Sequence, residues 1–121
     1  MKNILIVGAG GFIGSVCRYL CSMIPLKEHH VFPFKTFAVN IFGCMLIGLI
    51  TVIVEQKISV NPIAILFLKT GVCGGFTTFS TFALETSDML NNGNIFTALL
   101  YVTLSIGVGI GIIFLTAYVG K

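Results

Sequence analysis

The middle of the chain holds an unusual run of small, hydroxyl-bearing and aromatic residues at positions 71–82. The run reads Gly-Val-Cys-Gly-Gly-Phe-Thr-Thr-Phe-Ser-Thr-Phe, with three glycines in its first five positions. A helix that restarts after the glycines exposes free backbone N–H groups and the positive end of its dipole, which attract anions. In the alternative interpretation, phenylalanines at helical spacing only pack in the core, and the hydroxyls only form hydrogen bonds that hold the break together. The density of these residues predicts instead a functional centre that can receive an anion.

This run lies inside an apolar segment at residues 63–89, which is longer than the roughly 20 residues that a bilayer requires. Hydrocarbon does not tolerate an interrupted helix, because each freed backbone group costs several kcal/mol there. We therefore predict that the third span breaks into two half-helices at about residues 74–78. Other protein must enclose the break, or the break must line a polar path.

The composition places the chain in a membrane. Of its 121 residues 56% are hydrophobic and 9% are charged, whereas a soluble domain carries about 25% charged residues. Four apolar runs are each long enough to span, at Ile4–Ile24, Thr36–Val54, Ile63–Leu84 and Ile95–Val119. We expect an all-α integral membrane protein with residues 1–121 as a single four-span domain. The first run is too long for the apolar core of a signal peptide, so we expect a retained span.

Three polar features inside the spans each have two interpretations. Arg18 either turns toward a cavity or extends to the nearby interface. Asn40, one turn into the second span, is either a hydrogen bond between helices or a donor in a pore. A polar seam along the fourth span either bonds to another helix or walls a narrow aqueous route. The seam consists of Thr97, Tyr101, Ser105, Gly109 and Thr116.

Glycines four residues apart allow helices to approach closely. Such pairs occur at Gly10/Gly14, Gly71/Gly75 and Gly107/Gly111. Gly8, Gly11 and Gly14 imitate a dinucleotide-binding turn, but the chain lacks the βαβ unit that this fingerprint needs. We therefore assign the glycines to helix contacts. Four thin helices cannot easily enclose a polar route, so we expect an oligomer.

The basic residues outside the third span are balanced between the two sides of the membrane. Four spans place Lys2, Lys57 and Lys121 on one side, and Arg18, Lys27 and Lys35 on the other. Lys69, inside the third span, is left out of this comparison. Because Lys and Arg bias sets orientation, a balance predicts insertion both ways up and an antiparallel two-fold dimer. A small protein with few charges could also be balanced by chance.

Four features in chain order resemble the fluoride channels of the Fluc type, also called CrcB proteins or fluoride exporters. The likeness covers essentially the whole chain, and its third feature is the most specific. The features are residues 10–19, then Asn40 with Gly43, then residues 74–82 with Glu85, and finally Tyr101 with Ser105.

The resemblance implies a multi-pass protein of the cell's inner (plasma) membrane that exports fluoride passively and confers fluoride resistance. It implies a dual-topology homodimer in lipid, with two pores at the subunit interface and no nucleic-acid partner. The implied fluoride-pore residues are Asn40, Phe79, Ser80, Thr81, Phe82, Glu85, Tyr101 and Ser105. It also implies a structural Na⁺ at the dimer centre, held by the backbone carbonyls of Gly74 and Thr77. Gly109 departs from the expected pattern, since some relatives would carry another hydroxyl there.

The implied residue types suit fluoride. Hydroxyls, an amide and the positive edges of aromatic rings can replace its water without a full positive charge. We expect no enzyme activity, because no nucleophile–base pair, metal-ligand cluster or phosphate loop is present in the sequence. The four cysteines, which we expect to be reduced thiols, are Cys17, Cys21, Cys44 and Cys73. Two alternatives are a small four-span drug/proton exporter and a purely structural subunit. The first-span carboxylate and the tryptophan of such exporters are absent from the sequence.

Overall fold

The computed structural model describes residues 1–26, 30–56 and 59–120, and these residues form helices joined by short connections. Four helical spans are long and apolar enough to cross a membrane, which confirms the predicted all-α class. Three of them are α1 (Lys2–Ser22), α2 (Phe34–Glu55) and α6 (Ile95–Val119). The third covers Pro62–Asn91 and consists of α3 (Pro62–Ile65), the π-helix η1 (Leu66–Cys73), α4 (Gly74–Phe76) and α5 (Phe79–Asn91).

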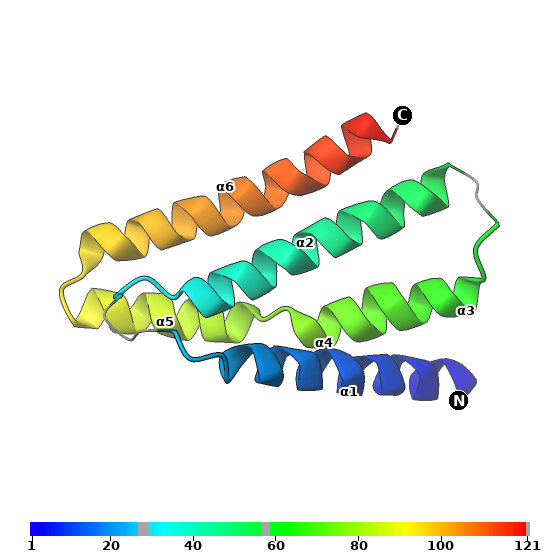
Figure 1. Cartoon of the computed structure of the whole chain (residues 1–121), viewed down its shortest axis with the longest axis horizontal. Helices are drawn as coiled ribbons and strands as arrows, with labels where there is room; N and C mark the ends of the chain where they lie inside the picture. The colour runs from blue at the N-terminus through cyan, green and yellow to red at the C-terminus, as the bar shows by residue number, and fades with distance from the viewer. Residues whose placement is uncertain (27–29, 57–58, 121) are drawn as a thin grey trace.

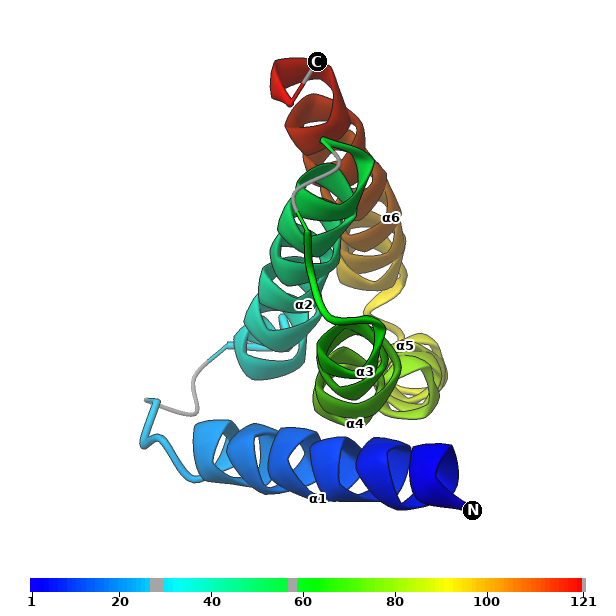
Figure 2. The same cartoon turned by 90° about the vertical axis from the view of Figure 1, so that its right-hand side faces the viewer.

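The four spans lie in a row, in the order α6, α2, third span and α1 (Figure 1). The main contacts are those of α2 with α6 and of α1 with η1 and α4. Figure 2 shows the third span lying between α1 and α2. The third span therefore has a neighbour on each side, and both α1 and α2 lie close enough to contact it near its break.

The start of α1 and the end of α6 lie on the same side of the molecule, which is also the side where α3 begins (Figure 1). An even number of spans requires this arrangement. It places Lys2 and Lys35 on opposite sides of the membrane. Lys27, Lys57 and Lys121 belong to the charge comparison but lie outside the described residues. The balanced topology therefore stays a prediction.

Two of the three predicted glycine pairs form the contact between α1 and the third span. A Cβ on Gly10 would lie 2.9 Å from Gly71 Cα, and one on Gly14 would overlap the Val72 carbonyl oxygen. A Cβ on Gly75 would overlap the carbonyl oxygen of Gly11. The backbones approach so closely that only hydrogen fits between them. The third pair, at positions 107 and 111, makes no such contact within the described chain, because Cβ atoms there would meet no neighbouring atom of the described residues. A helix contact at this pair stays a prediction.

The interior of the chain is small. The buried hydrophobic residues number six among those described, and the largest fully buried side chains are those of Tyr101 and Cys73. Tyr101 packs with Met89 and Ala98 where α5 meets α6. Large apolar side chains such as Phe12, Phe79 and Phe114 are more than two-thirds exposed. Most of the apolar surface of the single chain is therefore available to its surroundings.

Candidate functional site

The third span breaks at Thr77 and Thr78, within the range predicted from the sequence. Both residues are extended, with φ/ψ of −78°/158° at Thr77 and −148°/116° at Thr78, and α5 begins at Phe79. The Thr81 N–H donates to Thr78 Oγ1 at 3.2 Å. Thr78 is therefore the N-cap of α5, and its hydroxyl satisfies one of the free N–H groups that every helix start exposes.

Asn40 on α2 holds the break from the side. The Thr78 N–H donates to Asn40 Oδ1 at 2.8 Å, and Asn40 Nδ2 donates to the Thr78 carbonyl oxygen at 3.1 Å. Because a backbone N–H can only donate, the oxygen of the amide must be the atom that faces it. Of the two interpretations of Asn40, the bond between helices is present. The amide has a second N–H, so a role in a pore stays open.

Several backbone carbonyls lose their helical partners at the break, and those of Gly74 and Thr77 are two of them. An α-helix pairs the carbonyl of residue i with the N–H of residue i+4. The Thr78 N–H, which Gly74 O would take, donates to Asn40, and the Thr81 N–H, which Thr77 O would take, donates to Thr78 Oγ1. A Cβ on Gly74 would also meet no neighbouring atom of the described residues. Gly74 and Thr77 thus carry carbonyls that a cation could satisfy, and they are the pair implied for Na⁺.

Arg18 turns inward to the end of the first half-helix. Its Nε donates to Gly75 O at 3.2 Å, and Ser15 Oγ lies 3.5 Å from the same oxygen. In an unbroken helix Gly75 O would accept from the Phe79 N–H, but the break moves this N–H out of reach. A cation is also favourable at a helix C-terminus, where the dipole is negative. Arg18 therefore compensates one carbonyl of the break, and the inward interpretation of this residue is correct.

A cavity of about 300 Å³, here called the break cavity, opens between the break, α2 and α6. Its polar and aromatic lining includes Asn40, Cys44, Thr78, Phe79, Phe82 and Ser105. The rings of Phe79 and Phe82 lie 5.7 Å apart between centroids. Ser105 Oγ is buried and has no hydrogen-bond partner in the described part of the chain. A buried hydroxyl without a partner points to a ligand or water in this cavity.

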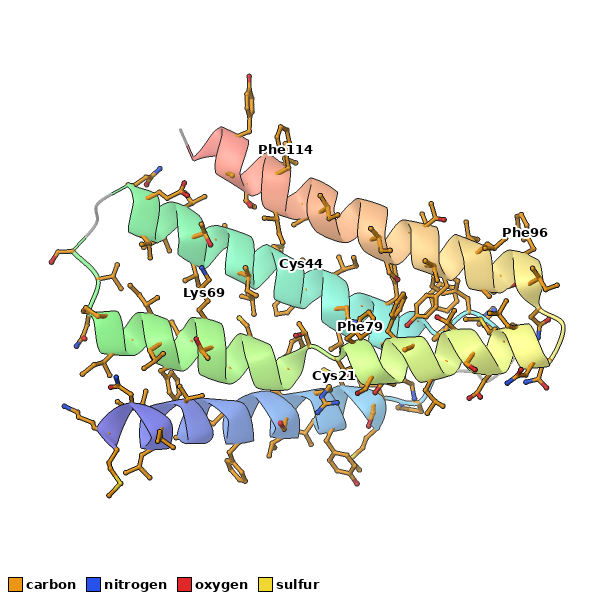
Figure 3. All side chains as sticks on the ribbon, turned by 180° about the vertical axis from the view of Figure 1, so that it is seen from behind. Cys21, Cys44, Lys69, Phe79, Phe96 and Phe114 are labelled. Carbon is orange, nitrogen blue, oxygen red and sulfur yellow. The ribbon has the colours of Figure 1, made fainter. Side chains whose placement is uncertain are left out.

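Figure 3 shows Phe79 at the break and Cys44 on the neighbouring α2. Phe79 is 79% exposed in the single chain. Phe82 is half-buried, with its ring 5.0 Å from that of Tyr101. The structure therefore brings together Asn40, Phe79, Phe82 and Ser105, four of the eight predicted pore residues.

Tyr101 and Glu85 form a separate hydrogen-bonded pair, in which Tyr101 is buried and Glu85 is partly buried. The Tyr101 hydroxyl donates to Glu85 Oε2 at 2.8 Å, and Thr36 Oγ1 donates to Glu85 Oε1 at 2.7 Å. Tyr101 is fully buried and does not line the break cavity, although the resemblance implies a hydroxyl on its wall. Thr36 is a partner that sequence reasoning did not assign. Its position one turn before Asn40, on the same helix face, was the available signal.

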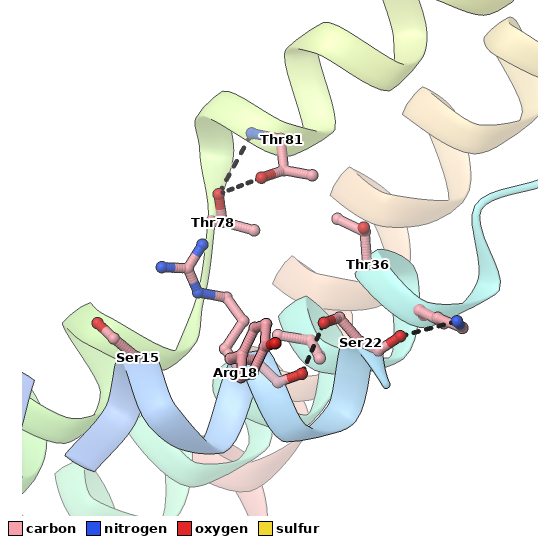
Figure 4. Close-up of a pocket in the computed structure, with 9 residues that line it drawn as sticks. Ser15, Arg18, Ser22, Thr36, Thr78 and Thr81 are labelled. Carbon is pink, nitrogen blue, oxygen red and sulfur yellow. Dashed lines mark hydrogen bonds between the residues drawn. The ribbon is translucent and has the colours of Figure 1, made fainter. Parts of the chain in front are cut away.

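The remaining predicted residues lie on other faces of α5. Ser80 is exposed, and Thr81 lines a second cavity of about 270 Å³ between α1, α2 and α5. Figure 4 shows Arg18, Ser15 and Thr78 in this cavity, which Lys35 also lines. Thr78 lines both cavities and therefore separates them at the break.

Comparison with known proteins gives one consistent family. The family described as "CrcB-like protein, Camphor Resistance (CrcB)" matches residues 5–117. A protein of Chlorobaculum tepidum named fluoride-specific ion channel FluC is 47% identical over 94% of this chain and 90% of its own length. The protein of that name from Flavobacterium psychrophilum is 43% identical over 91% and 90%. The one from Elusimicrobium minutum is 46% identical over 88% and 83%. Together with four apolar helices, these matches indicate a multi-pass membrane protein and confirm the resemblance.

Proposed function

Because the chain belongs to the CrcB-like family, we propose that it is a fluoride-selective passive channel that exports fluoride from the cytoplasm across the inner (plasma) membrane. The similar proteins described above are named fluoride-specific ion channels, and this favours a fluoride channel over a drug/proton exporter. The observation that supports it most is the break cavity. That cavity joins a buried hydroxyl without a partner, an amide and two aromatic rings, and no charged side chain is among its lining residues in the described chain.

Neutral donors suit the passage of fluoride. Fluoride must exchange its water for other hydrogen-bond donors, and it must also leave again for current to flow. Ser105 Oγ–H and the second N–H of Asn40 can donate to it, and the positive edges of Phe79 and Phe82 can face it. A guanidinium or ammonium group in the same place would bind more tightly and release more slowly. Arg18 instead lies on the other side of Thr78, in the second cavity.

A second, antiparallel copy would complete the route. Phe79 is 79% exposed, so a single chain leaves one rim of the break cavity open. Two copies related by a two-fold axis in the membrane plane would cover both break cavities with the same surface and would create two equivalent pores. The equal numbers of basic residues on the two sides, outside the third span, support insertion in both orientations.

The freed carbonyls of Gly74 and Thr77 fit a Na⁺ at the centre of that dimer. Two carbonyls from each copy would supply four oxygens, the type of ligand that hard cations prefer. Bound there, the ion would add positive potential near both routes and would join the two breaks. Exchange of Na⁺ for a large organic cation is expected to reduce dimer function, and unchanged function after complete exchange would contradict the site.

Ion efflux from lipid vesicles tests the function. Purified protein should release fluoride down its gradient without a proton gradient, as followed with a fluoride electrode, while chloride stays inside. Protein-free vesicles and vesicles with an unrelated four-span protein are the controls. Retention of fluoride, or efflux that needs a proton gradient, would contradict a passive channel, and the second result would favour the exporter.

A further inference from the structure

The polar seam of α6 loses its side chain at Gly109, one turn beyond Ser105. Gly109 is buried, so the position does not open onto solvent or lipid. A Cβ built there would lie 3.2 Å from Cys44 Sγ and 4.0 Å from Ile41 Cδ1. The thiol of Cys44 on α2 therefore packs directly against position 109, and it would have to shift by a few tenths of an ångström to admit a side chain there.

Cys44 is also part of the break cavity. It follows Asn40 by four residues and hence lies on the same face of α2. Both line the break cavity together with Ser105, whose buried oxygen has no partner within the described residues. The thiol thus shares a single cavity with the Asn40 amide and the Ser105 hydroxyl. The other three cysteines are absent from its lining.

We propose that the Cys44 thiol takes the place of the missing fourth-span hydroxyl and completes the row of donors that fluoride follows past Asn40 and Ser105. This inference rests on the proposed function. After Ser105 on α6, the next donor in this row is then the thiol of Cys44 on α2, beside Gly109. An S–H group is a weak hydrogen-bond donor, which suits a position from which the ion must depart.

A substitution series at position 44 tests the role of the thiol. Cys44→Ser keeps a donor of nearly the same size, whereas Cys44→Ala removes it. In the vesicle assay we expect fluoride efflux through C44S at or above the wild-type rate. We expect efflux through C44A to be about fivefold slower, because the loss of one neutral hydrogen bond corresponds to a factor of about two to ten.

A pair of double variants separates donation from packing. In the C44A background, Gly109→Ser restores a hydroxyl from α6, and Gly109→Ala restores a similar volume without a donor. The removal of Cys44 Sγ leaves room for either Cβ, because this sulfur is the closest atom to position 109. We expect C44A/G109S to recover efflux to within about twofold of the wild type, a change smaller than one neutral hydrogen bond, and C44A/G109A to stay as slow as C44A.

The outcomes distinguish this inference from the function on which it rests. Equal recovery in the two double variants would assign Cys44 to packing and overturn the inference. Equal fluoride efflux through the wild-type protein and C44A would also overturn the inference, but the proposed channel function would stand. Wild-type vesicles that retain fluoride would overturn the proposed function and this inference together.

Discussion

Asn40 and Thr78 pair through two hydrogen bonds across the break, at 2.8 Å from the Thr78 N–H and 3.1 Å to its carbonyl. One amide on α2 thus satisfies both backbone polar groups of an extended residue in the middle of the third span. The same pairing takes away the N–H that would continue the helix from Gly74. The break is therefore maintained by a neighbouring helix as well as by its own sequence.

Asn40→Ala should affect flux and stability together. The variant leaves the Thr78 N–H and carbonyl without their side-chain partner, which is expected to cost about 1–3 kcal/mol. It also removes a donor from the break cavity. We expect fluoride efflux to fall at least about tenfold, since one or two hydrogen bonds are lost. Asn92→Ala is the matched control, because Asn92 donates to Asp88 O in an exposed position. Equal efflux through both variants would remove Asn40 from the route.

Phe79→Ile tests the aromatic rim with little effect on the folded chain. Phe79 and Phe96 are both 79% exposed, but only Phe79 lines the break cavity. If ring edges face the ion, Phe79→Ile should slow fluoride efflux about three- to tenfold, and Phe96→Ile should leave it unchanged. Vesicle efflux and thermal unfolding in detergent are the measurements. A similar loss in both variants would point to a general effect of aromatic side chains in lipid.

Gly14→Ala tests the contact between α1 and the third span. The added methyl group would overlap the Val72 carbonyl oxygen and lie 2.8 Å from the Phe76 N, so the helices must separate. We expect a loss of about 1–3 kcal/mol in stability, as for other overpacked sites. Gly8→Ala, on the same helix, meets no neighbouring atom of the described residues. It should be neutral or stabilising by up to about 1 kcal/mol. Equal melting temperatures for the two variants would contradict this packing.

Much of the fold could be predicted because the bilayer limits the choices. Apolar length alone located four spans, and the glycines and hydroxyls of residues 71–82 located the break within a range that includes Thr77 and Thr78. Gly10, Gly14, Gly71 and Gly75 contact one another's helices as their spacing predicted. The spans and the break follow from the need to satisfy the backbone in hydrocarbon, and the glycine contacts follow from close packing of helices.

Partners between helices could not be predicted from spacing. The same seam on α6 contains Tyr101, whose hydroxyl bonds Glu85, and Ser105, whose hydroxyl has no partner within the described residues. Whether Arg18 turned inward depended on the Gly75 carbonyl, which becomes free only because the break removes the Phe79 N–H. Gly107 and Gly111 have the spacing of a helix contact but face no atom of the described chain. These outcomes depend on which helices are neighbours, and a single sequence does not state that.

Three lysines inserted in the loop at residues 55–61 test the antiparallel dimer. The insertion belongs before Asn61, whose side chain caps α3 through the Ile63 N–H. The added charge should fix one orientation, so the variant alone should carry little fluoride. Co-expression with a copy that has three lysines in the loop at residues 91–94 should restore efflux. Three inserted glutamines are the matched control. Full activity of the lysine variant alone would contradict the dual topology.

The most direct test of the central claim is the reversal potential of the purified protein in a planar bilayer, with unequal fluoride concentrations on the two sides and chloride added to the dilute side to balance the anions. The break cavity and its neutral donors predict a passive current whose reversal potential lies close to the fluoride equilibrium potential. A reversal potential near zero, which means equal permeability to the two halides, would contradict fluoride selectivity at the break. The absence of any current in symmetrical fluoride would contradict the channel itself.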